Sequence, residues 1–135
     1  MRNILTAEQF LIAILAVLKV RRIDQMPEDG SLDQRFERIY EKLIDQVEKG
    51  NLNVTPNFTF YRNPLHGNST RLRNALLAAR ESGLLAADVG PRPSYRLTMS
   101  EERARAYLRR SPLRADTLEG LVGEDFPKSP AVVAG

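Results

Sequence analysis

The chain has no cysteine and a single histidine, His66, among its 135 residues. Without cysteine it cannot build a disulfide framework, a thiolate nucleophile or a metal site with thiolate ligands. His66 lies in the turn-like sequence Asn-Pro-Leu-His-Gly and has no second histidine with which to bind a metal. Glycine-rich phosphate loops and nucleophile elbows are also missing. We therefore expect no metal, no cofactor and no enzymatic activity.

A long apolar run is missing too. The strongly apolar stretch Phe10–Leu18 is much shorter than the roughly 20 residues that span a membrane. Lys19 and Arg21 end it, Glu8 precedes it, and no small-residue cleavage site marks it as a signal peptide. The sequence favours a cytoplasmic protein in which this stretch is a covered helix, lying either in the core or in a subunit interface.

Positive charge is concentrated in one segment. Residues 1–60 carry 8 basic against 9 acidic side chains, residues 61–115 carry 11 against 4, and residues 116–135 carry 1 against 4. All eleven basic residues of the middle segment are arginine, whose planar guanidinium pairs with phosphate or guanine in a bidentate manner. Nucleic acid is therefore the first partner to consider. A GC-rich genome, which encodes arginine in preference to lysine, is the alternative explanation.

Three capping boxes predict where helices begin. They lie at residues 6–9 (Thr-Ala-Glu-Gln), 31–34 (Ser-Leu-Asp-Gln) and 98–101 (Thr-Met-Ser-Glu). The helices that follow are expected to end near Val20, Gly50 and Arg110. The second has apolar residues spaced by threes and fours on one face and mixed charges on the other, which predicts a solvated outer stripe.

The middle of the chain predicts a strand, a helix and a hairpin. Residues 57–61 suit a short strand inside a loop. A helix over residues 71–82, capped by Asn68, Ser69 or Thr70, stops at Gly83. Two strands, at residues 84–89 and 94–98, flank the tight turn Gly-Pro-Arg-Pro.

The segment from Ser69 to Thr98 resembles the second half of a winged-helix domain, a helix followed by a two-stranded wing. The resemblance implies an α+β, mainly helical fold with three to four helices and a small antiparallel hairpin in residues 1–110. Residues 111–135 are expected to form an extended or weakly helical tail. In this family the helix before the hairpin enters the DNA major groove, and the hairpin tip contacts the backbone or minor groove.

One feature departs from the family. A simple helix-turn-helix joins its last two helices by about 3–4 residues, whereas residues 50–68 intervene here. This insertion is expected to hold either the family's first strand, at residues 58–61, or a short helix near residues 63–66.

The free face of the third helix supplies the predicted site. At about 100° per residue, Leu72, Ala75, Leu76 and Ala79 face the core. Arginine and asparagine read guanine and adenine edges, and threonine can contact a phosphate or a thymine methyl. The predicted DNA-binding residues are Ser69, Thr70, Arg71, Arg73, Asn74, Arg80, Arg92 and Arg96. The alternative is that these are ordinary surface residues.

Leu77 lies in the middle of that face and does not suit a polar groove. A protein partner, the chain's own fourth helix or a homodimer contact would account for it better. We therefore expect sequence-dependent binding of double-stranded DNA by a transcriptional regulator, which forms a homodimer through the first or fourth helix. The alternative is a winged-helix protein-protein interaction module, an adaptor subunit of a larger complex.

Overall fold

The computed structural model describes residues 3–27, 31–61, 69–88, 90–91 and 93–126. The helices are α1 (Ala7–Val20), α2 (Leu32–Glu48), α3 (Thr70–Glu81), α4 (Glu101–Arg110) and α5 (Ala115–Val122). The strands are β1 (Asn3–Leu5), β2 (Gln25–Pro27), β3 (Val54–Pro56), β4 (Leu85–Asp88) and β5 (Ser94–Leu97). The expected α+β, mainly helical architecture is confirmed, although the described residues form five helices rather than three to four.

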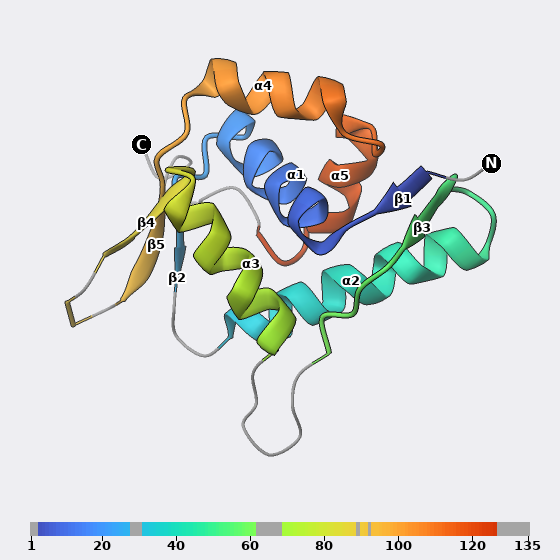
Figure 1. Ribbon diagram of the computed structural model, residues 1–135, viewed down its shortest axis with the longest axis horizontal. Helices are drawn as coiled ribbons and strands as arrows, with labels where there is room; N and C mark the ends of the chain where they lie inside the picture. The colour runs from blue at the N-terminus through green and yellow to red at the C-terminus, as the bar shows by residue number, and fades with distance from the viewer. Residues whose placement is uncertain (1–2, 28–30, 62–68, 89, 92, 127–135) are drawn as a thin grey trace.

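Helix α1 lies at the centre of the molecule, with α4 packed on one side and α3 and α5 on others (Figure 1). It begins at the predicted capping box, in which the Thr6 hydroxyl accepts from the Gln9 amide at 3.1 Å and the Gln9 side chain accepts from the Thr6 amide at 2.9 Å. Its apolar side chains are buried by the chain's own helices. A subunit interface is therefore not needed to explain the apolar surface of α1.

Two small sheets flank the helices. The first is antiparallel with strand order β2-β5-β4, in which Leu85 pairs with Leu97 and Met26 pairs with Tyr95. The second consists of β1 and β3 in parallel. The predicted hairpin is thus present as β4 and β5, and it gains a third strand from the connection between α1 and α2.

The strand predicted at residues 57–61 is wrong, because the strand in this region is β3 at Val54–Pro56. The alternation of Phe58 and Phe60 has another cause. Both rings are buried and contact Phe10 and Tyr40 at centroid distances of 5.5 to 6.1 Å. The aromatic residues of this loop are therefore part of the core, and the strand that joins the hairpin comes from β2 instead.

Two of the predicted capping boxes are also wrong in detail. Ser31 precedes α2, but its side chain makes no capping hydrogen bond there. Helix α4 is capped by Ser100, whose hydroxyl accepts from the Arg103 amide at 3.1 Å, and not by Thr98. The Thr98 hydroxyl donates instead to the Gly83 carbonyl at 2.8 Å, which links the end of the hairpin to the end of α3.

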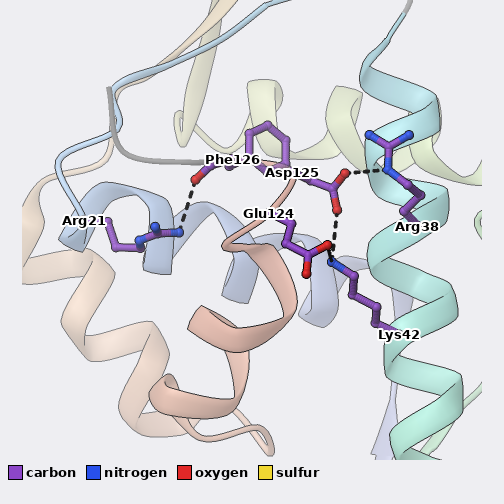
Figure 2. Close-up of polar contacts among 6 residues, drawn as sticks. All are labelled: Arg21, Arg38, Lys42, Glu124, Asp125 and Phe126. Atoms are coloured by element: carbon purple, nitrogen blue, oxygen red, sulfur yellow. Dashed lines mark hydrogen bonds and ion pairs between the residues drawn. The ribbon is translucent and has the colours of Figure 1, made fainter. Parts of the chain in front are cut away.

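The described part of the predicted tail packs onto the rest of the chain. Helix α5 buries Leu118, Leu121 and Val122 and contacts α1 and α2. Beyond it, the buried Asp125 carboxylate accepts from Arg38 at 2.6 Å and from Lys42 at 3.4 Å (Figure 2). The mixed-charge stripe of α2 is predicted from the sequence to face solvent only. Two of its cations, Arg38 and Lys42, instead form ion pairs with Asp125 in the segment after α5.

Candidate nucleic-acid interface

Helix α3 presents the outward face that the sequence predicts. The Ser69 hydroxyl caps it by accepting from the Leu72 amide at 3.2 Å, and Gly83 ends it with a φ of +76°, where a side chain would be strained. The core-facing residues are Leu72, Ala75, Leu76 and Ala79, as predicted. The exposed residues are Thr70, Arg71, Asn74, Leu77, Arg80 and Glu81.

Arg73 is not a free member of this face. Its Nη2 donates to Oδ2 of Asp33 in the first turn of α2, and the Arg73 side chain is only 32% exposed. Oδ1 of the same carboxylate accepts from the Ser69 amide at 3.0 Å. Asp33 therefore links the start of α3 to α2, and its ion pair places the guanidinium of Arg73 between these two helices.

Sequence reasoning missed Asp33. An acidic residue in the first turn of a helix is normally explained by the helix dipole or by capping, and nothing local to residues 31–34 indicates a partner in α3. Only the packing of α2 against the start of α3 reveals the role of Asp33, whose side chain is 3% exposed.

The hairpin lies beside α3. Helix α3 contacts β4, and a shallow depression of about 400 Å³ between them is lined by Leu77, Arg80, Glu81 and residues 85–87. Arg96 lies on β5, the central strand of the three-stranded sheet, and is paired in register with Ala86. Its guanidinium is 3.3 Å and 3.4 Å from the exposed Asp88 carboxylate. Arg92 lies outside the described residues, as does His66.

Two of the groups of exposed cations lie on α3 and on α4. Arg71 and Arg80 on α3 have no ion-pair partner within the described part of the chain. The arginines of α4 lie across α1 from them (Figure 1). There, Arg105 pairs with Glu101 at 2.9 Å, and Arg103 donates to the Tyr107 hydroxyl at 3.2 Å.

Leu77 is 50% exposed, one of three large apolar side chains so exposed among the described residues, the others being Ile4 and Tyr61. Helix α4 packs on α1 and leaves Leu77 uncovered. The chain's own fourth helix therefore does not explain this leucine.

The buried polar side chains of the described residues all have hydrogen-bond partners. No cluster of three or more histidine, aspartate or glutamate side chains in these residues could hold a metal ion. No helix found there has the length and apolar character that crossing a membrane requires. The arrangement described so far consists of a capped helix, a neighbouring hairpin and exposed arginines.

Comparisons of the chain with protein-family models, curated proteins and solved structures find no match.

Proposed function

We propose that this chain is a winged-helix protein that binds double-stranded DNA through α3 and the β4–β5 hairpin and acts as a transcriptional regulator. The observation that carries the proposal is the exposed face of α3 beside a three-stranded sheet of order β2-β5-β4. The order of elements α1, β2, α2, β3, α3, β4, β5 supports a winged-helix fold, in which a short first strand completes the sheet of the wing, while β3 pairs with β1 outside that sheet.

The electrostatics of α3 support contact with phosphate. The first turn of the helix contains no acidic residue of its own, and the Asp33 carboxylate that accepts from the Ser69 amide there is paired with Arg73. Arg71 and Arg80 lie on opposite flanks of the exposed stripe, about 100° and 80° from Thr70, where they would reach the two walls of a groove. Arg96 pairs only with an exposed carboxylate, an interaction worth about 0–1 kcal/mol, so a phosphate can replace Asp88 at low cost.

Fluorescence anisotropy with a labelled duplex tests the proposal. Affinity should fall steeply as salt rises from about 50 to 300 mM, because bound phosphates release counterions. Substituting Arg71 and Arg80 together by Ala should weaken binding and reduce the slope of log K against log salt by about 2. Arg105→Ala with Arg109→Ala on α4 is the matched control and should change neither quantity. Absence of binding at low salt would refute the proposal.

A protein-interaction module is the second candidate function, and Leu77 is the observation that favours it. A half-exposed leucine beside a depression lined by Leu85 and Ala86 can receive an apolar side chain of a partner. If the chain fails to bind DNA, loss of a protein complex on Leu77→Ala, with Arg71→Ala neutral, would support this function instead.

A further inference from the structure

Four side chains define the centre line of the exposed face of α3. Thr70, Asn74, Leu77 and Glu81 fall within about 40° of one direction around the helix axis, and all four are exposed. A helix that enters a groove along this line would bring them nearest to the bases. The base contacts therefore depend on these side chains more than on the flanking arginines.

The pairing of Arg73 with Asp33 removes a guanine reader from this face. Guanine is recognised by a guanidinium that donates to O6 and N7 together. The guanidinium of Arg73 donates to a carboxylate that is almost fully buried and that also holds the Ser69 amide. Exchanging this partner for a base would leave the buried carboxylate short of a donor, which is strongly unfavourable.

The remaining side chains match the chemistry of adenine and thymine. Asparagine donates and accepts in a bidentate manner at N6 and N7 of adenine, and an apolar side chain contacts the C5-methyl of thymine. Asn74 and Leu77 are separated by about 4.5 Å along the helix axis, close to the roughly 3.4 Å rise of one base step. The C5-methyl group of thymine would therefore give Leu77 an apolar contact in the otherwise polar major groove.

We propose that α3 selects a short A·T step in the major groove, with Asn74 reading adenine and Leu77 contacting the methyl group of a neighbouring thymine. This inference rests on the proposed function. It assigns Leu77 to DNA rather than to a protein, because its neighbours along the stripe, Thr70, Asn74 and Glu81, are polar.

The test uses the full chain and a pool of random duplexes. Sequences that it binds are selected and read, and an A·T step should be enriched at a fixed position. In the selected duplex, the thymine of that step is then replaced by deoxyuridine, which lacks only the C5-methyl group. The affinity of the wild-type chain should fall about fourfold, the effect expected for losing one buried methyl contact.

Single substitutions show which side chain contacts the thymine methyl group and which reads adenine. Leu77→Ala should bind the thymine and deoxyuridine duplexes equally, whereas Arg109→Ala on α4 should keep the fourfold difference. Asn74→Ala should lose about tenfold or more of the preference for adenine over guanine at its position. Both α3 side chains are exposed, so thermal unfolding should show that the variants fold like the wild type.

The possible outcomes distinguish the preference for an A·T step from DNA binding itself. Steeply salt-dependent binding without an enriched A·T step, or with an equal response of wild type and Leu77→Ala to deoxyuridine, would overturn this inference and leave the proposed function standing. Failure to bind any duplex at low salt would overturn the proposed function, and this inference with it.

Discussion

Asp33 connects α2 to the start of α3, and its removal should show how much that connection stabilises the fold. Asp33→Ala leaves the Ser69 amide without its acceptor and the guanidinium of Arg73 without its buried partner. Since an unsatisfied buried donor costs about 1–3 kcal/mol, we expect the free energy of unfolding to fall by about 2–3 kcal/mol, as measured by urea denaturation.

Asp45 provides the matched control, because it pairs with Lys49 at 2.9 Å on the exposed surface of the same helix. Asp45→Ala should change the free energy of unfolding by less than about 0.5 kcal/mol. Equal effects of the two substitutions would mean that Asp33 does not hold α3 in place.

Tyr40 makes the stability of the fold sensitive to alkaline pH. Burial raises the pKa of Tyr40 above its usual value of 10.0, and the nearby Tyr61 raises it further. Its hydroxyl donates to the Phe58 carbonyl at 2.9 Å, which requires the protonated form. The folded chain therefore holds this proton more tightly than the unfolded chain, and the stability this provides is complete below about pH 10 and is lost as pH rises through the raised pKa.

Urea denaturation at a series of pH values from about 7 to 11 measures this effect. The free energy of unfolding of the wild type should fall more steeply above about pH 10 than that of Tyr40→Phe, which has no proton to lose there. The variant should be less stable near neutral pH by about 1 kcal/mol, since it lacks the hydrogen bond. Parallel pH profiles would show that Tyr40 does not titrate differently on folding.

At the scale of the elements, the sequence predicts the helices well because their signals are local. The capping box at Thr6 and the 3.6-residue pattern of α2 depend only on neighbours within a turn or two, and both helices lie where expected. The buried face of α3 also follows from its spacing. These residues define the geometry of the candidate site, so most of the exposed face of α3 could be predicted.

The short strands could not be predicted, because pairing at a distance determines them. β2 is three residues long, contains Pro27 and exists through its pairing with β5, nearly seventy residues away. Phe58 and Phe60 alternate like a strand, yet the packing of their rings against α1 and α2 determines their position. The same reason explains why the partner of Arg73 was missed, since Asp33 is forty residues away along the chain.

Phe126 fixes the segment after α5 to the core, and this contact can be tested directly. Its ring lies 5.8 Å from that of Phe36 and under the guanidinium of Arg35 at 5.4 Å, and the Arg21 side chain donates to its carbonyl at 3.2 Å (Figure 2). Phe126→Ala should lower the free energy of unfolding by about 3 kcal/mol, because it removes a buried ring.

Phe126→Leu is the control for this contact, since it keeps most of the apolar volume and should cost less than half as much. Amide hydrogen exchange should also accelerate in α5 of the alanine variant, because the segment that fastens the helix is loosened. Unchanged stability and exchange would show that the residues after α5 contribute little to the fold.

In the whole molecule, α1 lies between α3 and α4, both of which carry exposed arginines (Figure 1). Helix α4 packs on α1, and it is joined to the end of α3 through Thr98 and Met99, which precede it. Exposed charges farther apart than about 8 Å are largely screened at physiological salt, so a duplex bound to α3 should have little effect on most of α4.

Backbone amide chemical shifts, followed during titration with a duplex at low salt, should therefore change in α3, β4 and β5 and remain unchanged in α4 and α5. The largest changes should lie at the start of α3, near Thr70 and Asn74, because these residues are exposed and would lie closest to the groove. Changes centred on Arg105 and Arg109 would place the interface on α4 instead, and the α3 proposal would then be wrong. Binding at both sides would give two sets of shifts that saturate at different DNA concentrations, since α1 separates the two surfaces.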